Sequence, residues 1–318
     1  MKRIFIGGTG RSGTTILLHA LYKHQDLYAV PIETKFLVEV DGLSTLCDQL
    51  STDFSITHAP VALSRFRTLM SEVLTGTGPN PYSAAYGKQA HVLPSLFANY
   101  EDALEAFFSA VHPQYTARHD LLVHCRQLVE TLFTVRASEL GKSGWVEKTP
   151  SNIARIEFLW ELYPDAYFVN CVRDPRGVLH SLQKKGWIVP DLAQAAHFLE
   201  RYFEFIAAKR EWALRSGHRF IDVKLESVVA APAEEMARLT SFLGLPDFAP
   251  ASREYLDQKL REGSIRWSAE QNRYADAWET EYGSQQRETI STILKDWIAH
   301  YGYALTPSSQ GSASELAA

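Results

Sequence analysis

The residues best suited to chemistry lie near the start of the chain. Gly8-Thr-Gly-Arg-Ser-Gly-Thr-Thr15 has the glycine spacing of a phosphate-binding loop. At the start of a helix, the successive backbone N–H groups from Gly10 to Thr15 form a concave site for an anion. The hydroxyls of Thr14 and Thr15 and the guanidinium of Arg11 add donors. Thr14 replaces the lysine with which a Walker A loop neutralises a triphosphate, so the loop predicts a ligand with a shorter anionic chain.

A second group of polar residues follows the apolar run that begins at Phe168. Arg173 ends this run, Asp174-Pro175 turns the chain, and Ser181 comes two turns along the expected helix. An arginine at the carboxyl end of a strand and a serine on the next helix can converge on one phosphate, because ligands of open α/β sheets bind at that edge. The alternative is that Arg173 and Asp174 form only a local ion pair. Paired with the glycine loop, this stretch predicts a second anion site.

These residues need a scaffold of strands and helices, and the hydrophobic pattern predicts one. Short β-branched or aromatic runs predict strands, and apolar residues at intervals of three and four predict helices. The predicted strands are 4–6, 144–150, 166–172 and 219–223, and the predicted helices are 14–23, 100–111, 121–140, 153–163, 177–185, 192–216, 232–243 and 285–301. The fold class is therefore α/β, a P-loop-like parallel sheet flanked by helices.

The middle of the chain differs from the rest. Residues from about 51 to 140 show mostly helical patterns and no clear strand. We therefore interpret this region as a helical insertion over the sheet, in which we expect the contacts that are specific to an acceptor substrate. We expect a single domain over 1–305 and a flexible tail at 306–318, which is rich in small residues.

The overall composition limits the partners. Of 318 residues, 46% are hydrophobic and 22% charged, and 32 Lys and Arg against 37 Asp and Glu give a formal net charge of −5. This balance predicts neither nucleic-acid nor membrane binding. Cys47, Cys125 and Cys171 are too widely spaced for a metal site or a disulfide framework, and no apolar run is long enough to span a membrane. We expect a cytoplasmic protein without a required metal, and the sequence leaves its oligomeric state open.

Together the two anion sites resemble the sulfotransferase family that uses 3′-phosphoadenosine-5′-phosphosulfate (PAPS). The segment from Arg11 to Thr15 resembles the family's 5′-phosphosulfate loop. Arg173 with Ser181, eight residues on, resembles its 3′-phosphate site. The ordered matches span roughly 3–246, and their combination is specific although each motif alone is weak.

Two later segments extend the resemblance. One family segment is resembled by Asp222-Val-Lys-Leu-Glu-Ser-Val-Val together with Phe242-Leu-Gly-Leu-Pro246, except that this chain has Leu225 where the family has a tyrosine. The family's loop that closes over the nucleotide is resembled by Arg266-Trp267. The donor-binding residues that the resemblance implies are Gly10, Arg11, Ser12, Gly13, Thr14, Thr15, Arg173, Ser181, Arg266 and Trp267.

Within the family, the glycine loop is most similar to tyrosylprotein sulfotransferases and related bacterial enzymes. Glu33-Thr34-Lys35 resembles the segment that carries their catalytic glutamate, and Glu147-Lys148-Thr149-Pro150 resembles the segment that carries their transition-state lysine. The resemblance thus implies Glu33 as general base, with Lys148 and Arg11 stabilising charge on the transferred group. Another branch uses a histidine as base, so His119, His124 and His180 are alternatives.

The expected activity is transfer of a sulfuryl group from PAPS to a hydroxyl or phenol by in-line displacement, leaving 3′,5′-ADP (PAP). The acceptor stays open: a peptide tyrosine, a phenolic metabolite, a carbohydrate or another alcohol. A small-molecule kinase is an alternative, although the loop lacks the kinase lysine. A nucleotide-binding module without catalysis is a second alternative, which the presence of both Glu33 and Lys148 disfavours.

Overall fold

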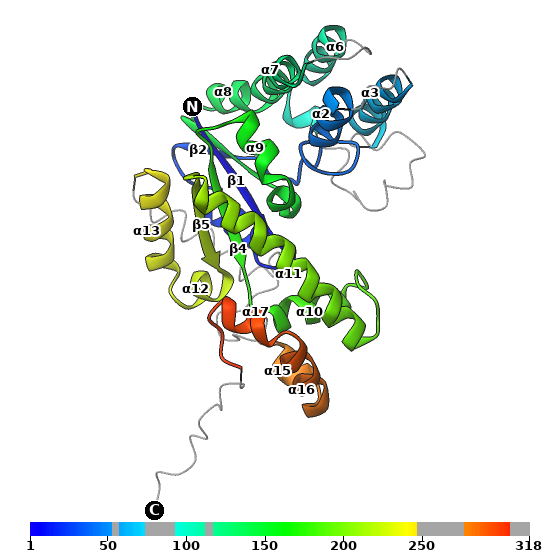
Figure 1. The fold of residues 1–318 in the computed structure, drawn as a ribbon. Coiled ribbons are helices and arrows are strands. Elements are labelled where there is room, and N and C mark those ends of the chain that lie inside the picture. Colours follow the sequence, from blue (N-terminus) through cyan, green and yellow to red (C-terminus); the bar gives the residue numbers. More distant parts are fainter. Residues whose placement is uncertain (53–56, 74–92, 112–116, 247–276, 306–318) are drawn as a thin grey trace, which may run out of the picture.

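The computed structural model describes residues 1–52, 57–73, 93–111, 117–246 and 277–305. Arg266 and Trp267, expected at the nucleotide, and the expected tail at 306–318 lie outside these residues. Figure 1 shows a sheet in the middle of the molecule, a group of helices beyond one end of its strands, and the C-terminal helices beyond the other end.

Five parallel strands form one sheet in the order β2-β3-β1-β4-β5. They are β1 (Lys2–Gly8), β2 (Leu27–Ala29), β3 (Gly144–Lys148), β4 (Tyr167–Val172) and β5 (Arg219–Lys224). The central strand β1 pairs with β3, where Ile6 is opposite Lys148, and with β4, where Gly8 is opposite Cys171. The α/β class with a parallel sheet is confirmed. The sequence pattern does not predict β2, because a strand of three residues is too short to show a period.

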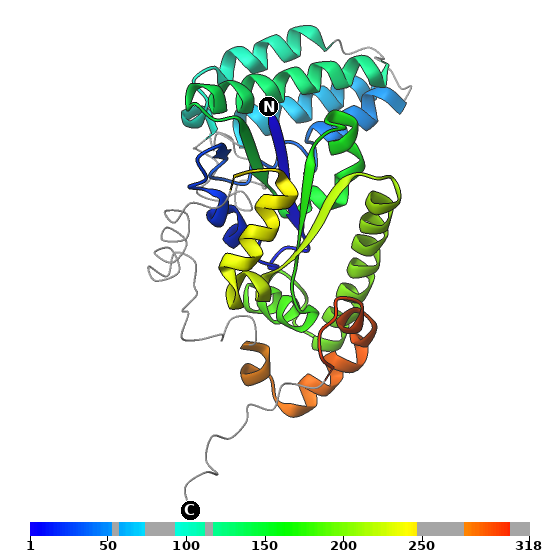
Figure 2. The ribbon, with the colours of Figure 1, turned by 90° about the vertical axis from the view of Figure 1, so that its left-hand side faces the viewer.

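The helices that follow the strands cover both faces of the sheet. They are α1 (Thr14–Leu21), the 3-10 helix η4 (Pro150–Arg155), α9 (Ile156–Leu162), α10 (Pro175–Lys184), α11 (Leu192–Arg215), α12 (Leu225–Ala230) and α13 (Pro232–Leu243). Alternate strand residues point to opposite faces. Ile4 and Ile6 pack with α1, α12 and α13, whereas Phe5 packs with α9 and α11. Figures 1 and 2 together show α13 and α11 on opposite sides of the sheet.

Between β2 and β3 the chain forms the helical group at the top of Figure 1. Its members are α2 (Leu43–Thr52), α3 (His58–Thr68), η1 (Leu69–Val73), α5 (Leu93–Leu96), α6 (Tyr100–Ala110), α7 (Arg118–Val129), η3 (Glu130–Thr134) and α8 (Val135–Glu139). The helix predicted over 121–140 is thus α7, a π-helical turn and α8. Within that turn Glu130 pairs with Arg3 of β1 at 2.7 Å, which ties the irregular turn to the sheet.

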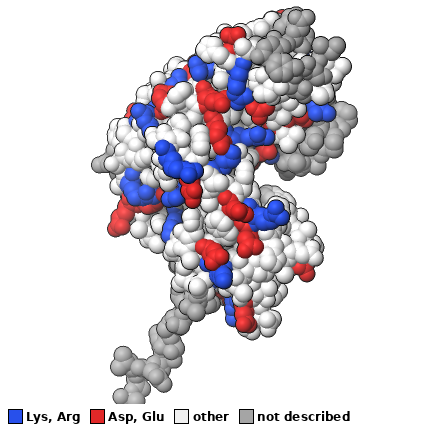
Figure 3. Space-filling view, in the orientation of Figure 1, with Lys and Arg blue, Asp and Glu red and all other residues white. Residues whose placement is uncertain are grey.

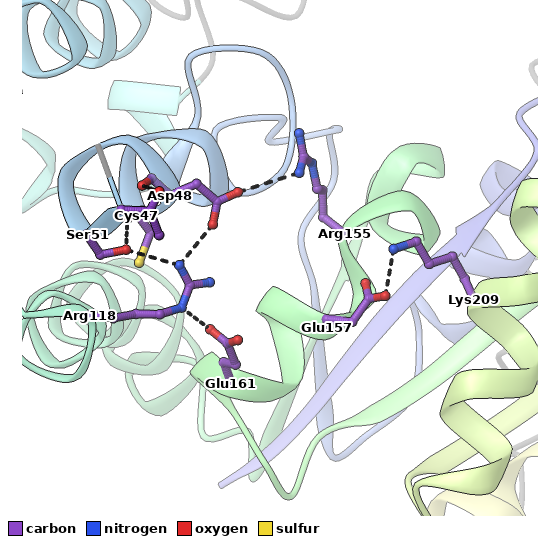
Figure 4. Close-up of polar contacts among 9 residues, drawn as sticks. Cys47, Asp48, Ser51, Arg118, Arg155, Glu157, Glu161 and Lys209 are labelled. Atoms are coloured by element: carbon purple, nitrogen blue, oxygen red, sulfur yellow. Dashed lines mark hydrogen bonds and ion pairs between the residues drawn. The ribbon is translucent and has the colours of Figure 1, made fainter. Parts of the chain in front are cut away.

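Ion pairs join this helical group to the helices on the sheet (Figure 4). The guanidinium of Arg118 on α7 donates to Asp48 of α2 at 2.9 Å and to Glu161 of α9 at 2.7 Å. On the other side of α9's first turn, Lys209 of α11 donates to Glu157 at 2.6 Å. The Arg118, Asp48 and Glu161 side chains are 31–47% exposed, so each pair contributes at most about 1 kcal/mol. These contacts orient the helices more than they stabilise them.

The C-terminal helices α15 (Ala277–Glu281), α16 (Ser284–Ile293) and α17 (Lys295–His300) pack against α10 and α11. Glu281 pairs with Lys184 of α10 at 2.9 Å. The Arg176 guanidinium of α10 lies over the Trp278 ring at 4.1 Å and donates to the carbonyl of Ala304 at 2.7 Å. The end of the described chain is thereby fixed to the helix that carries Ser181.

Three observations bear on the expected partners. Among the described residues, no helix has both the length and the apolar character needed to cross a membrane. In the same part of the chain, no three His, Cys, Asp or Glu side chains are grouped to hold a metal ion. All three cysteines are buried and free. That the reaction needs no metal stays a prediction.

His218 gives the fold a pH dependence. Its ring stacks on Trp160 with centroids 4.1 Å apart, and burial lowers its pKa from the ordinary value of 6.5. Because the unfolded chain then takes up the proton at a higher pH than the folded chain, the free energy of unfolding should fall as pH drops below about 6.5. His218→Phe keeps the stacking and should reduce this loss, measured as urea midpoints at pH 7.5 and 5.5. An unchanged difference between the two midpoints would contradict the prediction.

Candidate active site

The predicted anion loop connects β1 to α1 at the carboxyl edge of the sheet. Gly10, Arg11 and Gly13 have φ of 72°, 56° and 95°, a region that glycine adopts readily and arginine rarely. A side chain at Gly13 would lie 2.7 Å from Leu225, and one at Gly8 would lie 2.6 Å from the carbonyl oxygen of Cys171. The loop is therefore held tightly between β4 and α12. Of the residues that the structure describes, none comes within 4 Å of a Cβ added at Gly10, so the backbone is open to them there.

Ser12 occupies the interior of this loop. Its side chain is buried, and its Oγ has no hydrogen-bond partner among the described residues. A buried hydroxyl without a partner is costly, by about 1–3 kcal/mol, unless a ligand or water completes it. The Ser12 hydroxyl, close to the start of α1, can thus donate a hydrogen bond to an oxygen of a bound anion.

The structure brings the two predicted anion sites into contact. Arg11 Nε donates to Ser181 Oγ at 2.9 Å, and Arg173 Nη1 donates to the carbonyl oxygen of Arg11 at 3.0 Å. Burial lowers the pKa of Arg11, and the nearby Glu33 carboxylate opposes that shift. Arginine stays charged near neutrality despite such a shift. The guanidinium groups of Arg11 and Arg173 therefore converge from β1 and β4 on the same edge of the sheet.

The first turn of α10 is held by buried polar contacts. Asp174 caps the helix, because its Oδ1 accepts a hydrogen bond from the backbone N–H of Arg176 at 2.9 Å. Its Oδ2 also forms an ion pair with Arg176 Nη2 at 2.7 Å. The N–H of Asp174 donates to Glu226 at 3.0 Å, and burial raises the pKa of that carboxyl. The ion pair of Asp174 is therefore with Arg176, whereas the Arg173 side chain reaches the glycine loop.

Glu33 and Lys148 meet on the other side of the loop. Lys148 Nζ at the end of β3 lies 2.5 Å from Glu33 Oε1 and 3.2 Å from Thr15 Oγ1. The Lys148 side chain is 4% exposed and that of Glu33 is 25% exposed, so the carboxylate is the member of the pair that solvent or an acceptor can reach. The arrangement places a proton acceptor and a cation next to an anion loop.

The three histidines that could replace Glu33 lie elsewhere or are engaged. His119 and His124 are on α7, in the helical group, and Nδ1 of His124 is buried. His180 precedes Ser181, but its Nε2 lies 3.0 Å from Glu281 and its ring packs edge-on against Tyr282. Burial lowers the pKa of His180, although Glu281 opposes the shift. Among the described residues, Glu33 is thus the base candidate that contacts Lys148.

Two residues near the site have no role in the sequence analysis above. Trp187, in the loop after α10, is 67% exposed, and the Arg11 guanidinium lies 5.5 Å from its ring centroid. Glu147 is fully buried beside Lys148 and accepts several hydrogen bonds. A signal for Glu147 exists in the sequence, because a carboxylate inside a buried strand needs donors around it. No comparable signal marks Trp187.

One face of the molecule is indented. In Figure 3, the face seen in Figure 1 is hollowed between the helical group at the top and the part formed by α10, α11 and the C-terminal helices below. Charged side chains of both signs lie at the lower edge of this hollow, and the surface further below is mostly uncharged.

Comparisons with known proteins show the family of this chain. The sequence model of the sulfotransferase family matches residues 3–250. The chain is 22% identical to nodulation protein NoeE of Sinorhizobium fredii, over 94% of this chain and 65% of that protein. It is 24% identical to the omega-hydroxy-beta-dihydromenaquinone-9 sulfotransferase Stf3 of Mycobacterium tuberculosis, over 80% of this chain and 66% of that protein. The chain thus spans slightly less than two thirds of the length of these relatives.

Solved structures of two sulfotransferases are also similar to this chain. Sulfotransferase STF9 from Mycobacterium avium matches 95% of this chain and 77% of its own, with 15% identity and a TM-score of 0.49. The sulfotransferase domain from the curacin biosynthetic pathway matches 96% of this chain and 99% of its own, with 17% identity and a TM-score of 0.49. The sequence model of the family covers most of the chain. On that match, this chain belongs to the sulfotransferase family.

Proposed function

We propose that the chain transfers a sulfuryl group from PAPS to a hydroxyl or phenol of a small-molecule or peptide acceptor, leaving PAP. The observation that carries this proposal is the convergence of two arginines, a lysine and a carboxylate at one edge of the sheet. Arg11 bonds Ser181 at 2.9 Å, and Lys148 bonds Glu33 at 2.5 Å. Cations suit an anionic donor, and the carboxylate suits the deprotonation of an acceptor.

The donor fits the residues present. The unpartnered Ser12 Oγ and the open backbone at Gly10 suit the 5′-phosphosulfate, as do the hydroxyls of Thr14 and Thr15. Arg173 and Ser181 would hold the 3′-phosphate, which distinguishes PAPS from ATP. Because Arg11 already contacts both groups, it would connect the two ends of the donor site. Arg266 and Trp267 remain proposed closing residues.

The chemistry divides between donor and protein. When bound, PAPS supplies an activated sulfuryl group on a phosphate leaving group. The Glu33 carboxylate takes the proton from the acceptor hydroxyl. Lys148 Nζ, which Thr15 and Glu33 hold at the loop, and the Arg11 guanidinium stabilise the negative charge that builds up during transfer.

The acceptor is proposed to be an apolar or aromatic alcohol. The exposed ring of Trp187 beside Arg11 supports this class. The relative Stf3 carries in its name a hydroxylated menaquinone, which is also an apolar alcohol.

The test uses ligand-dependent stability and turnover. PAP should raise the melting temperature, whereas ATP with Mg²⁺ should not, because a ligand that binds only the folded state stabilises it by an amount that grows with the logarithm of the ligand concentration above the dissociation constant. PAPS with a panel of phenols and apolar alcohols should then give PAP and a sulfate ester. Stabilisation by ATP–Mg²⁺ alone would favour a kinase, and PAP binding without turnover on any acceptor would favour a binding module.

The glycine loop can be tested with a matched pair of variants. Gly10→Ala and Gly217→Ala both place a side chain at a φ of about +70°, with no described residue within 4 Å of it. Both variants should therefore lose about 1 kcal/mol of stability to backbone strain. Gly217 follows α11, away from the loop. Only Gly10→Ala should weaken PAP binding, by about 10-fold or more, because its methyl group would project into the open space in which the anion is proposed to bind. Calorimetric affinities that fall equally in the two variants would contradict the loop's role.

A further inference from the structure

The segment that carries Glu33 has no regular structure of its own. Between β2 and α2, residues 30–42 form turns and bends, and Lys35 and Asp41 have φ of 62° and 64°. Such values are uncommon for residues other than glycine and cost of order 1 kcal/mol each. Contacts with the rest of the fold must therefore hold Glu33 in place.

The contact next to Glu33 is with a buried carboxylate. Thr34 is fully buried and donates to Glu147 Oε1 from its hydroxyl at 3.0 Å and from its backbone N–H at 3.4 Å. Glu33 and Thr34 are consecutive, and so are Lys148 and Glu147. Two neighbouring residues of the segment 30–42 thus bond two neighbouring residues of β3, and the two bonds lie on opposite faces of the strand.

Glu147 also bonds the other segments around the site. Thr149 Oγ1 donates to Oε1 at 2.7 Å, and Asn152 Nδ2 donates to Oε2 at 2.7 Å and to the carbonyl oxygen of Ile6 at 3.0 Å. Ile6 immediately precedes the glycines that open the anion loop. The Glu147 network, which comprises Glu147, Thr34, Thr149 and Asn152, therefore joins the Glu33 segment, the end of β3 and the end of β1.

The network consists of donors directed at one charge. The two hydroxyls and two N–H groups that surround Glu147 all donate to it, which favours the carboxylate over the neutral acid. Burial opposes this by raising the pKa of Glu147, and the hydrogen bonds from Asn152, Thr149 and Thr34 counteract burial. A buried carboxylate keeps its donors in place, because leaving it without them would be costly.

We propose that Glu147 and Thr34 are positioning residues, which fix the Glu33 carboxylate over the anion loop through the Thr34–Glu147 hydrogen bond. The inference rests on the proposed role of Glu33 as general base. Neither residue touches the transferred group, and both act through Glu33. A small displacement of a catalytic group lowers the rate without changing how tightly the donor binds.

The test replaces the Thr34 hydroxyl and leaves its shape. Thr34→Val should lower kcat by about 10- to 100-fold, with the KM for PAPS and the affinity for PAP changed less than about twofold. Thr34→Ser keeps the hydroxyl and should restore most of the rate. Thr240→Val is the matched control, because Thr240 is equally buried but its hydroxyl bonds the carbonyl of Met236 within α13. The control should lose stability without a change in kcat.

The Glu33→Gln background separates the possible failures. If Thr34 acts through Glu33, adding Thr34→Val to Glu33→Gln should lower the rate no further. An additional 10-fold loss in that background, a Thr34→Ser as slow as Thr34→Val, or a Thr34→Val with wild-type kcat would each overturn the positioning role. A loss of PAP affinity in Thr34→Val that parallels its loss of kcat would do the same. If Glu33→Gln itself turns over normally, the proposed base is wrong and the inference falls with it.

Discussion

Replacing Glu33 by glutamine should lower kcat for a weakly acidic phenol by about 10³-fold, while the affinity for PAP stays within about twofold. The amide has nearly the size of the carboxylate. In the wild-type chain Lys148 Nζ lies 2.5 Å from Glu33 Oε1, and the amide oxygen can still accept a hydrogen bond from it. It cannot take up the acceptor's proton near neutral pH. The measurement is steady-state release of PAP, with calorimetric titration of PAP into the same preparation.

The acidity of the acceptor gives this prediction a second readout. A phenol that is already ionised at the assay pH needs no base, so Glu33→Gln should lose much less activity on it. Glu39→Gln is the matched control, since Glu39 lies in the same segment but bonds Ser151 on η4. It should retain the wild-type rate on both acceptors. A loss that is equal on weakly and strongly acidic phenols would assign Glu33 to binding or folding rather than to proton transfer.

The sequence predicts the parts of this site that depend on local pattern. Glycines before a helix predict the loop at Gly8–Thr15, and a buried run that ends at Arg173 predicts a cation at the carboxyl edge. Because all five strands are parallel, these features end at the same edge of the sheet and meet there. The bond between Arg11 and Ser181, 170 positions apart, follows from that topology more than from either local pattern.

Features that depend on tertiary contacts escape such reasoning. The pattern over 121–140 predicts one helix, but the turn at Glu130 is π-helical and is tied to Arg3 of β1. Glu33 lies in a segment without periodicity, and only the network around Glu147 shows how it is held. The exposure of Trp187 likewise depends on how the loop after α10 lies against Arg11. A single sequence contains no period or spacing that encodes these contacts.

Arg173→Met should remove the preference for a 3′-phosphate. In the folded chain Arg173 donates to the carbonyl of Arg11, and its cation lies at the edge where the 3′-phosphate is proposed to bind. Loss of a hydrogen-bonded charge costs about 1.5–3 kcal/mol, which corresponds to a PAP affinity lower by about 10- to 150-fold. Binding of 5′-AMP, which lacks the 3′-phosphate, should change much less. The quantity to measure is therefore the ratio of the two dissociation constants in one variant, which cancels general losses of folded protein.

Arg176→Met is the control that makes this ratio decisive. Arg176 is three residues further along the chain and is buried as Arg173 is. Its side chain pairs with Asp174 and donates to the carbonyl oxygen of Ala304, whereas the Arg173 side chain donates to the anion loop. Removing it leaves the Asp174 carboxylate without its cation, so the melting temperature should fall markedly while the PAP to 5′-AMP ratio stays near the wild-type value. If both variants lose the ratio, the arginines act by shaping α10. If neither does, the 3′-phosphate binds elsewhere, and the donor assignment must rest on the glycine loop alone.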